Sequence, residues 1–350
     1  MFLTKEEVLC FSDLLSGKRR IVITAHMSPD GDAMGSALGL KHVIDENMCC
    51  GEDRPEVTVV MPNRAPAFLM WLPGADKVVV ADEEQQRAEQ LLREADLLCV
   101  LDYCEMKRAG VVLQPLIESM DKPIVMIDHH INPGTHSPAL AMSYHEAPAT
   151  AFLVLELFNR LAEDGLTSRP VLSKETATCL YTGLMTDTGN FAFNNANIPQ
   201  LYRMVAQLLE AGIEKDKIYD NVYNQFSVDR LRFTGYCLYH KMRVFPKYNT
   251  ALIALSSEEL RRFNFQSGDA EGIVNMPLQI SSVYYSVFMR EDTDKIKISF
   301  RSQGDRPVNV YAQEVFGGGG HFNAAGGDSH RSLAETVKLF EDTFRSYFNK

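Results

Sequence analysis

Residues 21–36 read IVITAHMSPDGDAMGS and hold the pattern that decides the fold. The β-branched run at 21–24 is typical of a short buried strand, and the apolar spacing over 33–44 predicts a helix. The turn that joins them carries three side chains with oxygen or nitrogen donors: His26, Asp30 and Asp32. A strand followed at once by a helix is the first part of a βαβ unit.

The same alternation continues to about residue 130. Short apolar runs predict strands at 57–61, 78–81, 97–101 and 124–127. Residues 83–95, EEQQRAEQLLREA, predict a polar helix with an apolar stripe. Because short buried strands that alternate with helices form mainly parallel sheets, we expect an α/β fold with a doubly wound N-terminal sheet.

A helical region and a second strand-rich region follow. Helices are expected at 150–161, 173–185 and 199–210, and a polar helical connector at 215–240. Strands are expected at 251–255, 283–289 and 295–300, with helices at 257–263 and 333–347. The sequence therefore predicts a first domain at 1–212, a helical linker at 213–246 and a smaller α/β domain at 247–350.

Composition excludes several classes of protein. The 350 residues carry a net charge of −11, which argues against a long duplex-DNA footprint but not against a small phosphorylated ligand. Seven cysteines without a C-x-x-C pair favour reduced thiols in a cytoplasm over disulfides or a cysteine-based zinc site. The charged start at Lys5, Glu6 and Glu7 is not a signal peptide, and no run approaches the roughly 18 apolar residues of a membrane span. We expect no membrane partner.

Carboxylates and imidazoles recur where the predicted strands end. Asp102 follows the strand at 97–101, and Asp128, His129 and His130 follow the strand at 124–127. Asp187 lies near the end of the helical segment at 179–189. The carboxyl ends of parallel strands open onto one crevice, so we expect these side chains to meet there.

The chemistry of this set points to metal ions. Asp-Gly-Asp alone is usually a turn, and paired histidines alone are more often structural. Together they form an oxygen and nitrogen donor set without thiolate, which suits Mn²⁺ or a similar octahedral ion. The donors are too many for one ion. We therefore predict two ions about 3.5–4 Å apart, bridged by Asp102, that activate water against a phosphoryl group.

Residues 317–327, GGGGHFNAAGG, form a second conspicuous segment. Consecutive glycines let the backbone approach a ligand and turn its N–H groups toward an anion, although a flexible loop is the alternative. The following Asn-Ala-Ala is expected to open a helix. Upstream, the strand at 295–300 ends on Arg301 and Ser302, and arginine binds phosphate in a bidentate way. With His321, these residues predict phosphate recognition.

These strings resemble the motifs of the DHH/DHHA1 phosphoesterase family over nearly the whole chain. HMSPDGDAMGS resembles the first motif, Asp102 the second, Asp128-His129-His130 the third and Asp187 the fourth. FGGGGHFNAAGG resembles the signature of the C-terminal DHHA1 domain. The resemblance implies a DHH domain, a helical linker and a DHHA1 domain, with the active site in the interdomain cleft.

The resemblance also implies roles for single residues. One ion would be held by His26 and Asp30, the other by Asp32, His129 and Asp187, with Asp102 bridging. Asp128 would support His129, and His130 would face the scissile phosphate. The far nucleotide would be held by Arg301, Ser302, Gly318, Gly319, Gly320 and His321, with residues 271–275 close to it. Tyr103 and Cys104 are bulkier than the residues expected after the bridging Asp.

Within the family, the two-domain layout is similar to that of bacterial nano-RNases. This implies a manganese-dependent exoribonuclease-type enzyme that hydrolyses short oligoribonucleotides and 3′-phosphoadenosine 5′-phosphate. The alternatives are a phosphodiesterase for cyclic dinucleotides or pApA, a pyrophosphatase or exopolyphosphatase, and a nucleotide sensor without catalysis. A sensor should have lost metal ligands, and none is missing. Mg²⁺ and Co²⁺ remain alternatives to Mn²⁺, and the sequence leaves cleavage polarity and a homodimer open.

Overall fold

The computed structural model describes residues 1–48, 54–131, 137–192, 198–266 and 268–348. Cys49 and Cys50 lie outside these residues, and the other cysteines are free. The chain divides into two compact units, Met1–Gln225 and Phe226–Lys350. Helix α8 (Lys215–Tyr223) belongs to unit 1 and α9 (Val228–Tyr236) to unit 2. The separate linker at 213–246 stays a prediction. No described helix is long and apolar enough to cross a bilayer.

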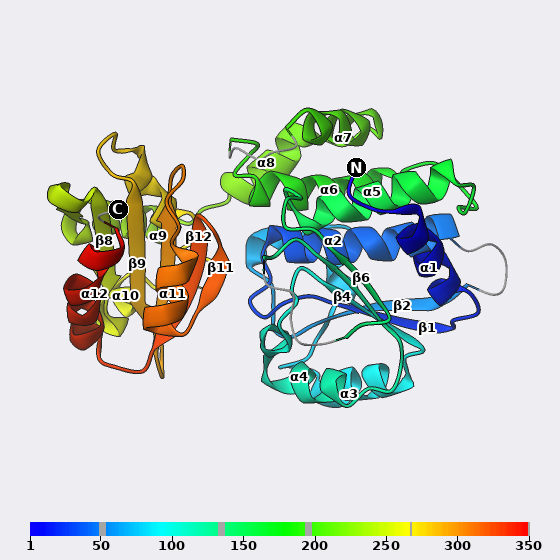
Figure 1. Cartoon of the computed structure of the whole chain (residues 1–350), viewed down its shortest axis with the longest axis horizontal. Helices are drawn as coiled ribbons and strands as arrows, with labels where there is room; N and C mark the ends of the chain where they lie inside the picture. The colour runs from blue at the N-terminus through cyan, green and yellow to red at the C-terminus, as the bar shows by residue number, and fades with distance from the viewer. Residues whose placement is uncertain (49–53, 132–136, 193–197, 267, 349–350) are drawn as a thin grey trace. The chain divides into compact units, whose positions relative to one another are not determined.

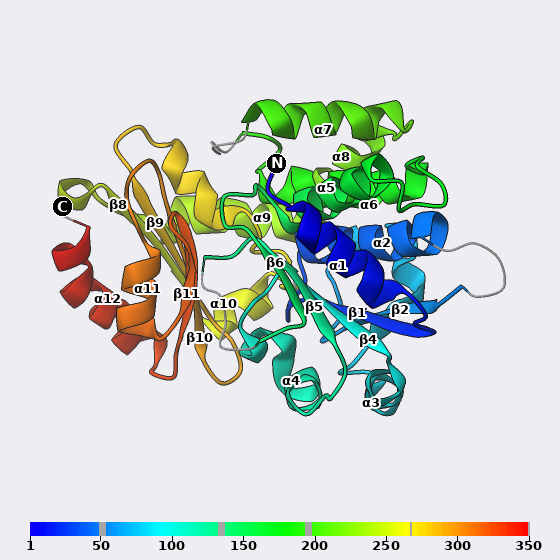
Figure 2. The same cartoon turned by 45° about the vertical axis from the view of Figure 1, so that its right-hand side comes forward.

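Unit 1 is built on a parallel sheet of six strands in the order β3-β2-β1-β4-β5-β6 (Figure 2). The strands are β1 (Arg20–Thr24), β2 (Glu56–Met61), β3 (Val79–Val80), β4 (Leu97–Leu101), β5 (Ile124–Asp128) and β6 (Leu140–Ser143). The chain runs outward from β1 in one direction and from β4 in the other. The predicted doubly wound fold is therefore confirmed, with its topological switch point between β1 and β4, where such sheets bind ligands.

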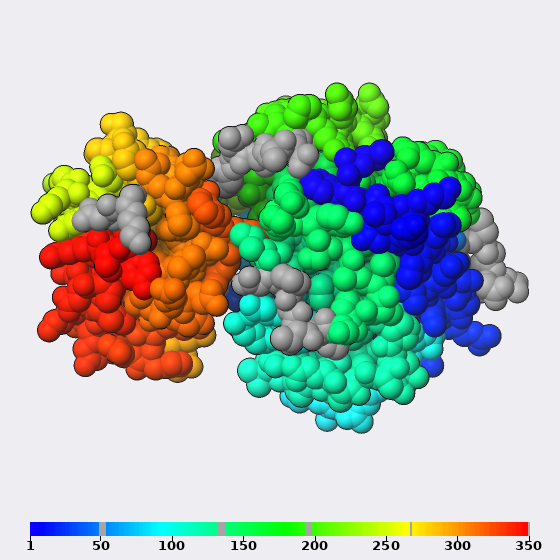
Figure 3. Space-filling view, in the orientation of Figure 1, coloured from blue at the N-terminus to red at the C-terminus, as the bar shows by residue number. Residues whose placement is uncertain are grey.

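Helices cover both faces of this sheet (Figure 1). One face carries α1 (Lys5–Leu15), α2 (Gly31–Val43), α5 (Thr150–Glu163), α6 (Lys174–Asp187) and α7 (Ile198–Glu210), and the other carries α3 (Gln85–Glu94) and α4 (Gly110–Glu118). Figure 3 shows α1 at the surface of unit 1, and its Val8 and Phe11 are buried against the core. Buried side chains on both faces explain why the strands are apolar without alternation.

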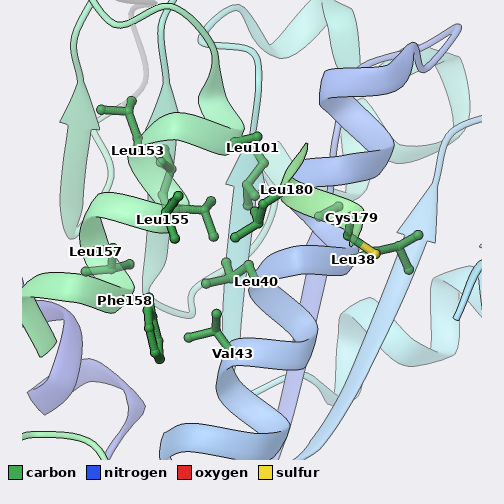
Figure 4. Packing of buried hydrophobic residues seen from close by; sticks show 14 of the residues in the cluster. Leu38, Leu40, Val43, Leu101, Leu153, Leu155, Leu157, Phe158, Cys179 and Leu180 are labelled. Carbon is green, nitrogen blue, oxygen red and sulfur yellow. The ribbon is translucent and has the colours of Figure 1, made fainter. Parts of the chain in front are cut away.

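Helices α2 and α6 lie close together in the core on the side of the sheet that carries α1, α2, α5, α6 and α7. Leu38 of α2 and Leu180 of α6 lie in one cluster with Leu101 of β4 (Figure 4). Gly35 permits the approach, because a Cβ there would lie 2.5 Å from the Cys179 carbonyl oxygen. At Gly183 a Cβ would lie 2.8 Å from Oδ1 of Asp32. These glycines let the two helices bring their carboxylates to the same edge of the sheet.

Unit 2 holds a mixed sheet in the order β11-β12-β10-β9-β8-β7, parallel only between β8 and β9. The strands are β7 (Arg243–Phe245), β8 (Thr250–Leu255), β9 (Tyr285–Glu291), β10 (Ile296–Ser302), β11 (Gly319–His321) and β12 (Ala324–Ser329). Helices α11 (Asn309–Phe316) and α12 (Leu333–Tyr347) cover one face. Helices α9 and α10 (Ser257–Arg262) pack against β8 and β9 on the other.

The expected helix after the glycine run is wrong. Residues 324–329 form strand β12, which pairs antiparallel with both β10 and β11. A Cβ at Gly318 would clash with the Gly326 carbonyl oxygen, and Gly320 has φ of 137°. The glycines therefore let β11 lie close against β12, and small residues fit that hairpin as well as they fit a helix start.

Substitution of Gly35 by alanine tests the close approach of α2 and α6. Gly35→Ala is expected to lower the free energy of unfolding by about 1–3 kcal/mol, because the new methyl group meets backbone atoms that cannot rotate away. Urea unfolding is followed by the fluorescence of Trp71, the single tryptophan, for unit 1, and by far-ultraviolet circular dichroism for both units. Gly235→Ala is the control, since Gly235 is exposed on α9 with open space around it and its substitution should be neutral or stabilising. Equal effects of the two substitutions would contradict the packing argument.

Candidate metal centre

Asp102 occupies the tip of the central strand β4 and organises the cluster around it. Its φ is +62°, and its N–H donates to the Ile127 carbonyl at 3.0 Å. The residue is 2% exposed, and Oδ1 accepts a hydrogen bond from Thr150 Oγ1 at 2.9 Å. A left-handed backbone at a non-glycine residue is strained and persists only where its surroundings hold it. Both the backbone and the carboxylate of Asp102 are held by neighbours in this way.

His26 lies on one side of Asp102. Its Nε2 is 3.2 Å from Asp102 Oδ2 and 3.7 Å from Asp30 Oδ2. Its Nδ1 is 2.9 Å from the Met27 carbonyl oxygen, the distance of a hydrogen bond donated by a protonated Nδ1. With Nδ1 as the donor to this carbonyl, Nε2 is directed at the carboxylates; it donates to them when protonated, and in the neutral tautomer it has a lone pair for a metal ion. His26 therefore presents a metal-binding nitrogen to two carboxylates.

Asp30 caps α2 with one oxygen and leaves the other for the cluster. Its Oδ1 accepts the backbone N–H groups of Asp32 and Ala33, both at 3.0 Å. An aspartate at a helix N-cap gains these hydrogen bonds and the favourable end of the helix dipole. The second oxygen, Oδ2, faces His26. The helix start thus orients a potential ligand.

His129 lies on the other side of Asp102. Its Nε2 is 3.4 Å from Asp102 Oδ1, 3.3 Å from Asp187 Oδ2 and 3.8 Å from Asp32 Oδ2. Its Nδ1 is 3.2 Å from the Ala147 carbonyl oxygen, which favours the same tautomer as in His26. The arrangement around His26 is repeated here with a second set of carboxylates.

Asp32 is held by the first turn of α5. Its two oxygens accept the N–H groups of Thr150 at 2.6 Å and of Ala151 at 2.9 Å. These are among the N–H groups that a helix leaves without an internal partner, so they stabilise a buried carboxylate. The hydrogen bond from Thr150 to Asp32 joins residues that lie 118 positions apart in the chain.

The crowding of carboxylates shifts their protonation in opposite directions. Burial and the charges of Asp102 and Asp187 raise the pKa of Asp32 well above its usual value. Burial opposes ionisation of Asp102 too, but hydrogen bonds from His129 and His26 hold its pKa well below the usual range. Burial favours neutral His129, yet Asp187 and Asp102 raise its pKa well above the usual value. Protons on Asp32 and His129 therefore offset the negative charge of the carboxylates, and divalent cations would offset it more completely.

The donor set therefore fits divalent metal ions. In each of two groups of residues, the potential ligand atoms lie within 4.8 Å of one another. The first group is His26, Asp30 and Asp102, and the second is Asp32, His129 and Asp187. All are oxygen or imidazole nitrogen donors, the set that suits octahedral ions. Every predicted ligand belongs to one of the groups, and Asp102 lies between them with one oxygen toward each histidine. These groups form a candidate centre for divalent metal ions.

Asp128 is paired differently from the expectation. Its Oδ1 lies 2.7 Å from Nδ1 of His130, whereas Nδ1 of His129 faces the Ala147 carbonyl. Asp128 ends β5 and is 0% exposed, so its position is set by the sheet. Support of His129 by Asp128 is therefore corrected to support of His130. Tyr103, which follows Asp102 and is bulkier than the residue expected there, is buried on the side of the sheet that carries α3 and α4.

Arg108 is a residue that the sequence did not single out. Its Nη1 lies 2.8 Å from Nε2 of His130 and 3.4 Å from the Asp102 carbonyl oxygen. Its own carbonyl accepts the N–H of Met27 at 2.6 Å, which ties the turn after β4 to the turn after β1. The only signal was a basic residue soon after the end of a central strand. A guanidinium beside several carboxylates is a candidate phosphate-binding group.

The predicted substrate residues lie in unit 2. Arg301 is paired with Ala324, and Ala324 with His321, so these side chains share one face of the sheet. Ser302 points to the opposite face, where its hydroxyl donates to the Arg306 carbonyl and accepts from Asn323 Nδ2. Within 271–275, Ile273 and Val274 are buried in the core against β8 and β9. Substrate contact by any of these residues stays a prediction.

Comparison with known proteins agrees with these features. The chain matches the DHH family, N-terminal domain, over residues 20–184 and the DHHA1 domain over residues 249–350. It is 30% identical over 318 residues to the bifunctional oligoribonuclease and PAP phosphatase NrnA of Thermus thermophilus, covering 87% of this chain and 83% of that protein.

Two further similarities extend over almost the whole chain. A crystal structure of an exopolyphosphatase-related protein from Bacteroides fragilis is similar with a TM-score of 0.87 and 41% identity, covering 99% of each chain. The cyclic-di-AMP phosphodiesterase GdpP of Bacillus subtilis is 24% identical over 96% of this chain and 49% of that protein.

Thermal unfolding with and without Mn²⁺ tests the metal centre without any substrate. Ligands that bind only the folded state raise the melting temperature, so Mn²⁺ should raise that of the wild type. Asp102→Asn should remove most of this increase, because the amide is uncharged and has one oxygen in place of the two that face His26 and His129. Asp121→Asn, at a side chain that is 87% exposed, should keep it. An equal increase in all three proteins would contradict the assignment.

Proposed function

Because the chain belongs to the DHH–DHHA1 family, we propose that it hydrolyses short oligoribonucleotides and 3′-phosphoadenosine 5′-phosphate at the cluster around Asp102. The observation that carries the proposal is the position of Asp102, whose Oδ2 is 3.2 Å from one histidine Nε2 and whose Oδ1 is 3.4 Å from another. A carboxylate between two imidazole groups suits a pair of metal ions that act on a phosphate ester.

The proposal assigns each ligand to an ion. His26 and Asp30 hold one ion, Asp32, His129 and Asp187 hold the other, and Asp102 contributes to both. Mn²⁺ is proposed because both sets contain imidazole, with Mg²⁺ and Co²⁺ as alternatives. When bound, such a pair lowers the pKa of a water molecule and offsets negative charge on the phosphoryl oxygens.

His130 and Arg108 are proposed to act on the substrate phosphate. Nδ1–H of His130 donates a hydrogen bond to Oδ1 of Asp128, so Nε2 of His130 can accept a hydrogen bond from Arg108. This contact uses Nη1 of Arg108 and orients the planar guanidinium beside the cluster. The remaining N–H groups of the guanidinium can donate to phosphoryl oxygens as negative charge develops on them.

Unit 2 is proposed to bind the nucleotide part of the substrate. Arg301 and His321 share a face of its sheet, and their positive or hydrogen-bonding side chains suit a phosphate. The backbone of Gly318, Gly319 and Gly320 is proposed to contribute N–H groups, and Ser302 to orient the neighbouring chain. A few local cations are enough for a short substrate, so a net charge of −11 is no obstacle. A cytoplasmic location belongs to the same proposal, since its substrates are cytoplasmic nucleotides.

A cyclic-dinucleotide phosphodiesterase is the second candidate. The observation that favours it is the similarity to cyclic-di-AMP phosphodiesterase GdpP over 96% of this chain. The same ligand groups would serve either reaction, because both break a phosphodiester bond. The difference would lie in the residues that hold the nucleotide.

A time course with Mn²⁺ on several substrates decides between the candidates. The substrates are a 5′-labelled RNA dinucleotide, a 24-mer, 3′-phosphoadenosine 5′-phosphate, cyclic di-AMP and pyrophosphate. Faster turnover of the dinucleotide and the bisphosphate than of the 24-mer is expected. Preferential opening of cyclic di-AMP would favour the second candidate, and turnover of pyrophosphate alone would contradict both.

Substitution of Arg108 tests its part in the reaction. Arg108→Ala is expected to lower kcat by about 100-fold, because one donor to the developing charge is lost. Arg108→Lys keeps the charge without the planar fork and should recover only part of the rate. Lys107→Ala, at an exposed neighbour, is the control and should leave kcat unchanged. Unaltered kcat in Arg108→Ala would remove Arg108 from the proposal, whereas loss of the Mn²⁺-dependent rise in melting temperature would make its role structural.

A further inference from the structure

Strand β10 presents a row of polar side chains on one face of the sheet of unit 2. Residues alternate along it, with Ile298 and Phe300 in the core beneath α11 and α12, and Lys297, Ser299 and Arg301 on the other face. In the middle of this row, the neighbours of Ser299 on β12 and β11 are glycines. Ser299 is paired with Gly326, which is paired with Gly319. The middle of this row on β10 therefore lies beside a part of the sheet surface that has no side chains.

Lys297 is the residue of this row that the proposed function does not use. It is paired with Arg290 on β9 and with Asp328 on β12. Asp328 forms an ion pair with Lys295 at 2.8 Å, and Arg290 binds both oxygens of Asp292 at 2.9 and 3.2 Å. The charged neighbours of Lys297 thus have partners of their own. No hydrogen bond or ion pair joins Lys297 Nζ to any residue that the structure describes.

The charge of Lys297 is not compensated by a direct contact with a carboxylate among the described residues. The ammonium is half-buried and lies on the strand next to the guanidinium of Arg290. Burial and the charge of Arg290 lower the pKa of Lys297 more than the charges of Asp292 and Asp328 raise it, so the charged form of Lys297 is unfavourable. A partly buried cation without a partner is unfavourable unless a counter-charge arrives. A phosphate of the substrate would supply that charge.

The distance from Arg301 to Lys297 along β10 indicates which phosphate of an oligonucleotide could reach Lys297. Lys297 lies four residues before Arg301 on the same face, which at the rise of a strand is about 13 Å. At a rise of about 3.4 Å per nucleotide in a stacked strand, this distance corresponds to about four nucleotides. A dinucleotide is therefore too short to reach from Arg301 to Lys297, and a tetra- or pentanucleotide is long enough. A substrate held at Arg301 would reach Lys297 only when it has further nucleotides.

We propose that Lys297, beside Arg290, is a second phosphate-binding subsite for oligonucleotides longer than a dinucleotide. The inference rests on the proposed function, since it assumes that Arg301 binds an oligonucleotide phosphate. It adds a determinant of substrate length. The first phosphates are bound at Arg301 and His321, and the charge of Lys297 stabilises only the longer substrates.

Hydrolysis of RNAs of two to five nucleotides tests the subsite. Lys297→Ala should lower kcat/KM about tenfold for the tetra- and pentanucleotide, because one charge-assisted contact is lost, and by less than about twofold for the dinucleotide and 3′-phosphoadenosine 5′-phosphate. Lys297→Arg keeps the charge and should restore the longer substrates. Lys338→Ala is the control, since Lys338 is exposed on α12, which covers the other face. Equal losses at every length, or no loss for the tetranucleotide, would overturn the inference.

Binding measured in EDTA separates this inference from the proposed function. Fluorescence anisotropy with labelled di- and tetranucleotides requires no turnover. Lys297→Ala should weaken the tetranucleotide only, and the slope of log affinity against log salt should fall by about 0.7, as for one phosphate contact on a single strand. If the wild type hydrolyses no oligonucleotide, the proposed function fails, and this difference still decides the subsite. Identical binding by the two proteins would exclude it.

Discussion

The burial of several carboxylates around Asp102 is the constraint on which unit 1 depends. Like charges in a medium of low dielectric repel strongly, so the cluster exists only because each carboxylate has compensation. Asp32 receives two N–H groups from the start of α5, Asp30 receives two from α2, and Asp102 lies between two imidazoles. The helices that supply these groups also cover the sheet, so the same packing stabilises the fold and holds the cluster together.

The orientation of the histidines adds a second level of organisation. Backbone carbonyls of Met27 and Ala147 accept hydrogen bonds from Nδ1 and leave each Nε2 directed at the carboxylates. In His130 a carboxylate takes the place of the carbonyl, and Nε2 meets the guanidinium of Arg108 instead. Adjacent histidines in the sequence therefore have different surroundings, because successive residues at a strand end point in different directions. This separates the proposed metal ligand from the proposed substrate contact.

Much of the cluster could be predicted because strand ends are visible in the sequence. Apolar runs mark the strands, and a parallel sheet brings their carboxyl ends to one edge whatever the details of packing. The partner of Asp128 could not be predicted, since a difference of one residue in direction decides between His129 and His130. Arg108 was missed because its position depends on a turn whose carbonyl is bound by Met27, a contact between distant parts of the chain. In unit 2, the residues after the glycine run suited a helix start or a strand equally, and pairing with β10 decided for the strand.

The sequence by itself determined the α/β class and which residues offer metal-binding atoms, because these follow from periodicity and from residue types at strand ends. It also indicated the family, through the resemblance of its motifs. The tertiary structure alone decided which oxygen of each carboxylate faces which nitrogen, and which residues support them. It also decided that Lys297 has no hydrogen-bond or ion-pair partner among the described residues, while Lys295 pairs with Asp328. Hydrogen bonds and ion pairs depend on distances of a few tenths of an ångström and on direction, and these arise only when segments far apart in the chain pack together.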